Sequence, residues 1–325
     1  MNDRRPIAVT VGDPAGIGPE IVVRLLSDGT PHPAVAIGDI AALRRAASLL
    51  GRKVDVVSVG WDGPFERKAG EIPVIATSDL ADVAWGRIDA RCGRAAHDAI
   101  VAAARAAIDG RARAVVTAPI HKEALAAAGI AFPGHTELLA AEAGGVNVAM
   151  MLANDELRVL LVSIHVSLRD AVALVTEDNV LRAIGFADRA CRQLGVAHPR
   201  VAVAGLNPHA GENGLMGDED QQQIAPAVNA ARAAGIEATG PWSPDTIFMR
   251  ARRGEFDIVV AQYHDQGIIP IKYMGLDKGV NVTIGLPFVR TSVDHGTAFD
   301  IAGKGIADAS SLRAAFDMAA RMAPI

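Results

Sequence analysis

Short apolar runs separated by longer mixed segments dominate the pattern of the chain. Runs rich in Val, Ile and Ala occupy residues 7–11, 114–116, 158–163, 200–205 and 257–261. Unbroken runs of this length are typical of strands buried on both faces of a parallel sheet. Helices are predicted between them, over residues 18–26, 87–109, 177–194 and 220–234. This alternation predicts an α/β sheet with crossover helices.

Length, charge and cysteine content narrow the class of protein. A chain of 325 residues, half of them hydrophobic, is long enough for two packed domains or one large α/β domain. Its net charge of −5, with acids and bases interspersed, argues against a nucleic-acid partner. No apolar stretch reaches the about 18 residues that a membrane span needs. Cys92 and Cys191 lie far apart in no CxxC motif, which predicts buried thiols in a cytoplasmic protein.

Three histidines follow three of the predicted strands. His165, His209 and His264 each lie a few residues beyond the carboxyl end of an apolar run. Ligands bind at that edge of open α/β sheets, so the three imidazoles can converge there. Three neutral nitrogen donors suit Zn²⁺ with an open fourth position, although Mg²⁺, Mn²⁺ and Co²⁺ also remain candidates. The simpler alternative is that each histidine is a hydrogen-bonded loop residue.

Asp265 follows the third histidine directly, in the segment YHDQG. Beside a metal it would orient a ligand or accept a proton from substrate. The alternative is a structural role as the cap of a following helix.

Basic residues downstream suggest an anionic ligand. Lys272 and Arg290 stand among mostly apolar residues, where burial without an anionic partner would be costly. A phosphate or carboxylate of a substrate would supply that partner. Earlier, His135 and Thr136 follow a Pro-Gly turn at a probable helix start, where backbone N–H groups favour an anion. The alternative is that Thr136 only caps the helix and binds no anion.

The glycine-rich segments do not match nucleotide-binding motifs. Gly12, Gly16 and Gly18 in VGDPAGIGPE depart from GxGxxG, and Ile21 occupies the place of the third small residue. A tight turn between strand and helix explains them. The GKG at residues 303–305 lacks the upstream glycine and the Ser/Thr of a P-loop. The sequence therefore gives little support to a kinase or ATPase.

Taken jointly, the motifs are specific to one family. They read VGDPAGIGPE, TAPIHKEAL, PGHTELLA, LNPHAGENG, PDTIF, YHDQGIIPIK and GVNVTIGLPFVRTSVDHGTAFDIAG, and they span residues 9–305. The chain resembles the 4-hydroxythreonine-4-phosphate dehydrogenase family of vitamin B6 biosynthesis. The resemblance implies the two-domain α/β fold of isocitrate and isopropylmalate dehydrogenases. It implies a discontinuous domain of residues 1–132 plus 297–325, and a central domain of residues 133–296 that carries the metal and substrate residues.

The resemblance also assigns roles to individual residues. It places a divalent metal on His165, His209 and His264, shared across the interface of a homodimer. Substrate binding falls to His135, Thr136, Lys272, Asn281 and Arg290, and Lys272, Asp265 and Asp245 become the candidates for catalysis. The tail DHGTAFDIAGKGIAD resembles the adenine-side cofactor loop of the related dehydrogenases, which makes His295, Gly296, Thr297, Ala298 and Asp308 candidates to bind NAD or NADP.

The implied reaction oxidises the 3-hydroxyl of a 4-phosphorylated hydroxy acid by hydride transfer, and the resulting β-keto acid loses CO₂. A second branch of the family acts on 4-phospho-D-threonate and 4-phospho-D-erythronate. The segment HAGENGLMGDED and the GTAFDIAG tail resemble this sugar-acid branch more closely, since biosynthetic members tend to read HAGEGG in the first of them. The segment HVSLRD also departs from the biosynthetic pattern, so the sugar-acid branch is modestly favoured.

Two other classes of protein fit parts of the pattern. A zinc hydrolase also uses three histidines and a water. A catalytically silent sugar-acid-phosphate binder would keep the fold alone, although it has no need of three metal donors.

Overall fold

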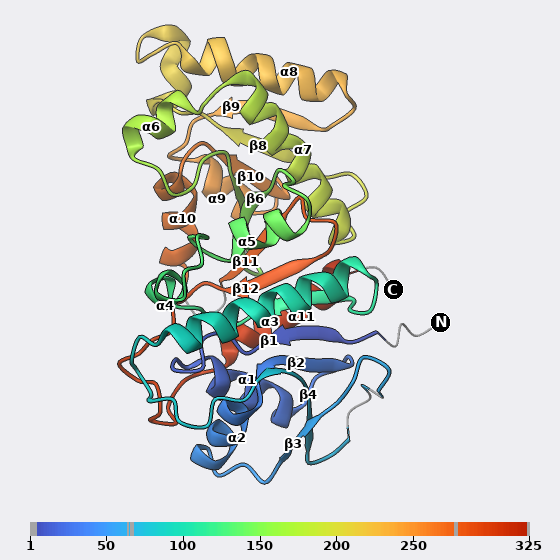
Figure 1. The fold of residues 1–325 in the computed structure, drawn as a ribbon. Helices are drawn as coiled ribbons and strands as arrows, with labels where there is room; N and C mark the ends of the chain where they lie inside the picture. The colour runs from blue at the N-terminus through green and yellow to red at the C-terminus, as the bar shows by residue number, and fades with distance from the viewer. Residues whose placement is uncertain (1–4, 64, 66–67, 276–278, 324–325) are drawn as a thin grey trace. The chain divides into compact units, whose positions relative to one another are not determined.

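The computed structural model describes residues 5–63, 65, 68–275 and 279–323. The chain divides into two compact units (Figure 1), which we call the terminal unit, Met1–Val148 with Leu286–Ile325, and the central unit, Ala149–Gly285. The terminal unit is discontinuous and contains both ends of the chain. The domain limits expected from the resemblance, at 132/133 and 296/297, stay a prediction, because packing units and domains need not share their boundaries.

The terminal unit contains strands in the order β3-β4-β2-β1-β5-β12, and each adjacent pair of these strands is parallel. Its strands are β1 (Ile7–Thr10), β2 (Ala34–Asp39), β3 (Asp55–Ser58), β4 (Glu71–Ser78), β5 (Ala114–Thr117) and β12 (Arg290–Val293). Its helices are α1 (Gly18–Asp28), α2 (Ile40–Leu49), α3 (Ala90–Ile108), α4 (Lys122–Ala127), α5 (His135–Glu142) and α11 (Ser310–Met322).

Helices cover the sheet of the terminal unit because its central strands are apolar on both faces. Strands β1 and β5 are buried at every position. Helix α3 packs on β1, β2 and β5, and Figure 1 shows it crossing in front of β1. Helices α1 and α11 contact each other, and α11 packs on β5 and β12. Pro19 lies in the first turn of α1, as predicted, because its fixed φ suits a helix start.

The central unit has the strand order β11-β6-β7-β10-β8-β9. Its strands are β6 (Ala149–Ala153), β7 (Arg158–Leu161), β8 (Val201–Ala204), β9 (Ala238–Trp242), β10 (Ile258–Ala261) and β11 (Val280–Ile284). Its helices are α6 (Leu168–Ala173), α7 (Glu177–Gln193), α8 (Ala225–Ala233), α9 (Ile247–Arg252) and α10 (His264–Tyr273), with a 3₁₀ segment η1 (Pro208–Gly214) and a π-helical turn η2 (Asp220–Ile224).

The predicted apolar runs all form strands, and the fold class is α/β as expected. One feature of the central unit differs from the parallel pattern: β6 pairs antiparallel with β7 and with β11. The link from β6 to β7 is a tight turn in which Asn154 Oδ1 accepts from the backbone N–H of Leu157 at 2.8 Å. A link this short cannot hold a crossover helix, so the two strands must run in opposite directions.

Candidate active site

Three parallel neighbouring strands bring the histidine loops to one edge of the central sheet. Strand β10 lies between β7 and β8, with Ala261 in register with Leu161 and Val260 in register with Val203. Neighbouring strands lie about 4.8 Å apart, so loops that leave them at the same edge start close together. His165, His264 and His209 are carried by these three loops.

Two of the three imidazoles lie side by side. The ring centroids of His165 and His264 are 5.6 Å apart, with 43° between the ring planes. His264 is the first residue of α10, and its Nδ1 lies 2.7 Å from Asp265 Oδ1. His209 Nδ1 lies 3.4 Å from Ser243 Oγ, which in turn donates to Asp245 Oδ1 at 2.5 Å. The structure thus places Asp265 against His264, and Asp245 one hydroxyl away from His209.

The backbone at His209 has an uncommon conformation. Residues 209–213 all have φ values between 40° and 75°, so η1 contains a left-handed turn. Such a turn costs roughly 1–2 kcal/mol for each residue with a Cβ, and other contacts must hold it. Asp220, which is fully buried, accepts from the backbone N–H groups of Leu206 and Asn207 at 2.8 and 3.1 Å. This carboxylate fixes the start of the loop that presents His209.

A network of two glutamines ties the three strand ends together. Gln262 Nε2 donates to the carbonyl of Ala204 at 2.7 Å, and Gln266 Nε2 donates to the carbonyl of Gly205 at 2.8 Å. Gln266 Oε1 accepts from the backbone N–H of Gln262 at 2.7 Å. Ser163 Oγ, at the end of β7, donates to the carbonyl of Gln262 at 2.9 Å. These bonds fix the spacing of the loops that carry the histidines.

The three histidines are suitable ligands for a divalent cation, although their side chains are not arranged around a common metal position in this structure. Within the described part of the chain, no three His, Cys, Asp or Glu side chains are arranged to hold a metal ion. The Nδ1 atoms of His209 and His264 face oxygen partners, which is the arrangement that directs Nε2 of a ligating histidine toward a metal. His165 and His209 are exposed, and His264 is partly exposed.

The surroundings of Asp245 favour the ionised form of its side chain. The hydrogen bond from Ser243 holds the pKa of Asp245 below its usual value, and the nearby His209 acts in the same direction. Asp245 is therefore ionised at neutral pH and can act as a proton acceptor.

The predicted anion-binding residues His135, Thr136 and Arg290 lie in the terminal unit. Arg290 is only 2% exposed, and its Nη2 donates to Thr117 Oγ1 at 2.6 Å. Burial lowers the pKa of Arg290 to about 9, so the guanidinium still carries its charge at neutral pH. Burial, and then the charge of Arg290, hold the pKa of His135 well below its usual value. The neutral ring of His135 keeps Nε2 buried with no hydrogen-bond partner among the described residues, and Thr136 follows in the first turn of α5.

The other two predicted substrate residues belong to the central unit. Asn281 on β11 donates from Nδ2 to Met150 Sδ at 3.1 Å, and its Oδ1 is buried without a partner in the described structure. Lys272 lies in the last turn of α10 and is exposed. The argument that a buried Lys272 would need an anionic partner therefore does not apply, because the helix turns this position to the surface. Its assignment to substrate binding now depends on the resemblance alone.

The predicted cofactor loop is anchored to the amino-terminal glycine motif. The backbone N–H of Ile17 donates to the carbonyl of Thr297 at 3.0 Å, and the N–H of Gly303 donates to the buried carboxylate of Glu20 at 2.7 Å. A Cβ at Gly16 would lie 2.9 Å from Thr297 Cβ, so a larger residue would push the loop away. The VGDPAGIGPE motif thus supports the loop, as well as forming the turn that the sequence predicted.

Individual residues of that loop have different surroundings. Thr297 is buried, and Ala298 has a positive φ of 43°. His295 Nδ1 lies 3.0 Å from the carbonyl of Gly296. Asp308 is exposed, and its Oδ1 accepts from the backbone N–H of Ser310 at 2.8 Å at the start of α11. Through that bond Asp308 stabilises the start of α11, and its contact with the cofactor stays a prediction.

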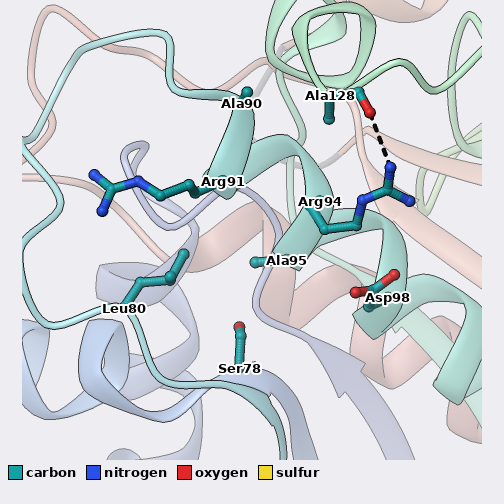
Figure 2. Close-up of a pocket in the computed structure, with 8 residues that line it drawn as sticks. All are labelled: Ser78, Leu80, Ala90, Arg91, Arg94, Ala95, Asp98 and Ala128. Carbon is teal, nitrogen blue, oxygen red and sulfur yellow. Dashed lines mark hydrogen bonds between the residues drawn. The ribbon is translucent and has the colours of Figure 1, made fainter.

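A pocket in the terminal unit contains none of the predicted site residues (Figure 2). Its volume is about 390 Å³, and its lining comprises Ser78, Leu80, Ala90, Arg91, Arg94, Ala95, Asp98 and Ala128. Arg91 is already paired with Asp82 and Asp89, and Arg94 donates to the carbonyl of Ala128 at 2.9 Å. The charges around this pocket are therefore engaged, and the pocket is a weaker candidate site than the histidine loops.

Sequence reasoning missed the residues that support the site. The sequence does not mark Gln262, Gln266, Ser163 or Asp220 as supporting residues, because the bonds by which they join separate strand ends and loops link positions 13 to 99 apart in the chain. For Gln262, Gln266 and Ser163 the available signal was their position just beyond a strand end. Within the described residues, no helix is both long and apolar enough to cross a membrane.

Comparisons with known proteins agree with this architecture. A model of the family described as "Pyridoxal phosphate biosynthetic protein PdxA" matches residues 30–319. A 4-hydroxythreonine-4-phosphate dehydrogenase of Beijerinckia indica is 56% identical over 98% of this chain and 95% of its own length. A D-threonate 4-phosphate dehydrogenase of Salmonella typhimurium is 43% identical over 99% of this chain and 100% of its own.

Solved structures show the same fold. The 1.25 Å crystal structure of a 4-hydroxythreonine-4-phosphate dehydrogenase from Klebsiella pneumoniae has a TM-score of 0.89 at 44% identity, covering 98% of this chain and 100% of the other. The expected family and the expected enzyme class, an oxidoreductase of the dehydrogenase type, are confirmed. The chain therefore belongs to the family described as the pyridoxal phosphate biosynthetic protein PdxA.

Proposed function

We propose that this dehydrogenase uses a divalent metal and NAD or NADP to oxidise the 3-hydroxyl of a 4-phosphorylated 3-hydroxy acid, whose carboxylate is then lost as CO₂. The observation that carries the proposal is the pair of imidazoles, His165 and His264, 5.6 Å apart at the edge where the His209 loop also begins. Relatives whose names specify 4-hydroxythreonine 4-phosphate or D-threonate 4-phosphate support this class of substrate.

His165, His209 and His264 would hold the metal. A divalent cation bound there would supply a fixed positive charge beside the substrate hydroxyl and the departing carboxylate. Three imidazoles favour zinc among the candidate ions. The supporting oxygens of Asp265 and Ser243 keep the rings of His264 and His209 oriented.

The chain's own acids and bases handle the protons. Asp265, in the first turn of α10, and Asp245 lie beside the proposed metal-binding histidines, and both are exposed. Either carboxylate can accept the proton of the 3-hydroxyl, and Lys272 can return a proton after CO₂ leaves.

Arg290 and His135 would bind the phosphate or carboxylate of the substrate. A buried guanidinium is stabilised by an anion, and the unpartnered Nε2 of His135 lies in the same group. Together with Thr136, Lys272 and Asn281, they would fix the position of the substrate.

One of the segments that favour the sugar-acid branch departs from the biosynthetic HAGEGG at Asn213. This residue has φ 57°, a conformation that asparagine and glycine both adopt readily. The change from HAGEGG to HAGENG is therefore accommodated by the backbone, and it does not by itself indicate a contact with substrate. We keep both phosphorylated acids as candidate substrates, with the sugar acid still favoured only by the motif.

A cytoplasmic homodimer is part of the proposal. Exposed apolar side chains of the central unit flank the histidine loops: Val166, Leu168, Val172 and Leu174 follow His165, and Leu215, 82% exposed, follows the His209 turn. Clustered exposed apolar residues mark protein interaction sites, which supports an active site beside a subunit interface.

Both cysteines are free and buried, and burial raises the pKa of each to about 12.

The deciding experiment measures reduction of the nicotinamide. The metal-stripped protein is reloaded with Zn²⁺, Mg²⁺, Mn²⁺ or Co²⁺ and assayed with each phosphorylated acid and each dinucleotide. Metal-dependent absorbance of the reduced cofactor, with CO₂ released in equal amount, is the expected result. Hydrolysis without reduction would identify the zinc hydrolase, and metal-dependent binding without turnover would identify a silent binder.

A further inference from the structure

The terminal unit has an unassigned pair of polar side chains where its strand order reverses. The chain runs from β1 to β2 on one side of β1 and later reaches β5 on the other side. Ligands of open α/β sheets bind at such a switch point, outside the carboxyl ends of the strands. Asp13 lies just beyond β1 and His121 just beyond β5, and the backbone N–H of Asp13 donates to the carbonyl of Pro119 at 2.9 Å.

Both side chains keep a buried polar atom without a partner. Asp13 is 1% exposed, and its Oδ1 accepts from the backbone N–H of Ala15 at 2.8 Å. Its Oδ2, like Nδ1 of His121, is buried and has no hydrogen-bond partner among the described residues. Buried polar atoms are nearly always paired, so two such atoms at a switch point indicate a missing ligand.

The surroundings of the pair include the predicted cofactor loop. The His121 ring stacks on Phe299, with centroids 4.6 Å apart and 23° between the planes. Phe299 packs with Ala15 against a small buried cluster, and Ile17 binds the carbonyl of Thr297. One wall of the site is therefore the loop whose resemblance implies a nicotinamide cofactor.

The charges around Asp13 indicate the kind of ligand. The pKa of Asp13 is raised to about 6, chiefly by burial and also by Asp89, against the opposing effects of the hydrogen bond from Ala15 and of His121. Cys92 is close and remains a neutral thiol, while Arg45 donates to the carbonyls of Pro14 and Val83. A carboxylate of this kind repels a phosphate and is stabilised by a neutral hydrogen-bond donor.

We propose that Asp13 and His121 bind a neutral donor group of the nicotinamide dinucleotide, either a ribose hydroxyl or the carboxamide N–H. The loop through Thr297 and Phe299 forms the adjoining wall. This inference rests on the proposed dependence on NAD or NADP. It adds two residues of the amino-terminal half to the expected cofactor site, which had been confined to residues 295–308.

The test measures the dissociation constant of NADH and NADPH by fluorescence between pH 5 and pH 8. Asp13→Asn should weaken binding about tenfold at pH 8, as expected for loss of a hydrogen bond to a charged group. Near pH 5, where Asp13 of the unsubstituted protein is mostly protonated and the side chain is uncharged in both proteins, the two constants should converge. Asp39→Asn is the matched control, because Asp39 is equally buried and both its oxygens accept from backbone N–H groups, of Ala42 and Leu80.

Cofactor fragments show which half of the dinucleotide carries the donor. A loss confined to reduced nicotinamide mononucleotide places the donor in the nicotinamide half, and a loss confined to AMP places it in the adenosine half. His121→Ala, at a partly exposed position, provides a second variant should Asp13→Asn fold poorly, and it should also weaken binding.

Equal affinities of Asp13→Asn, His121→Ala and the unsubstituted protein at pH 8 would overturn the inference. An unsubstituted protein that binds neither dinucleotide would instead refute the proposed function itself.

Discussion

The side-chain amide of Gln262 reaches from the end of β10 to the carbonyl oxygen of Ala204, the last residue of β8, at 2.7 Å. Gln266 makes the parallel link to Gly205, one residue further along. Because His264 lies between the two glutamines in the chain, both bonds fix one metal-site loop against another. The geometry of the proposed metal site thus depends on residues that never touch the metal.

Replacing Gln266 with leucine should therefore loosen the site. The carbonyl of Gly205 and the N–H of Gln262 would lose their partner, which costs about 1–3 kcal/mol of stability. Metal affinity should fall about tenfold or more, as found for residues that orient ligands. Competition with a chelator measures the affinity, and Gln193→Leu on the exposed end of α7 is the control. Unchanged metal affinity in Gln266→Leu would show that the network is structural only.

His209→Ala removes one of the three proposed donors. Metal content and turnover should both collapse, while the thermal unfolding midpoint changes little because His209 is exposed. Elemental analysis of the purified protein measures the metal. His198→Ala, at another exposed position of the central unit, should retain both metal and activity. Full metal content with normal turnover in His209→Ala would contradict the assignment.

Arg290→Ala should weaken substrate binding and leave the metal in place. A charged hydrogen bond contributes about 1.5–3 kcal/mol, which corresponds to a rise of about 10- to 100-fold in KM. Arg113→Ala is the matched control: Arg113 is also buried in the terminal unit, but it donates to the carbonyl of Ala320 at 2.9 Å. That variant should lose stability without a change in KM. An unaltered KM in Arg290→Ala would argue against an anion-binding role.

Asp13 should make stability depend on pH. Its pKa is raised to about 6 from 3.8, so between these values the folded protein binds more protons than the unfolded chain. Stability therefore falls as pH rises through this window, by about 3 kcal/mol once Asp13 is ionised. Asp13→Asn cannot ionise, so it should gain stability relative to the unsubstituted protein between pH 4 and pH 8.

Unfolding midpoints of both proteins at several pH values measure this effect. Asp39→Asn should instead be destabilised at pH 8, because its carboxylate accepts two backbone hydrogen bonds. A difference between Asp13→Asn and the unsubstituted protein that is constant with pH would mean that Asp13 does not titrate in this range.

Much of the architecture follows from local patterns. The five apolar runs became β1, β5, β7, β8 and β10, because β-branched runs of strand length between turn signals have few other stable conformations. The position of each histidine beyond a strand end followed from the same pattern. The antiparallel β6 did not, since the direction of a strand depends on the partner it finds and on the length of the link to it.

The sequence by itself determined that His165, His209 and His264 would each follow the carboxyl end of a buried strand. Tertiary structure alone decided that β10 lies between β7 and β8, that Gln262 reaches Ala204, that Lys272 is exposed, and that the Asp13 carboxylate is buried. The physical reason is the distance along the chain over which each effect acts. Strand-forming tendency and helix capping depend on a few neighbouring residues, whereas burial, strand pairing and pKa depend on groups that only folding brings together.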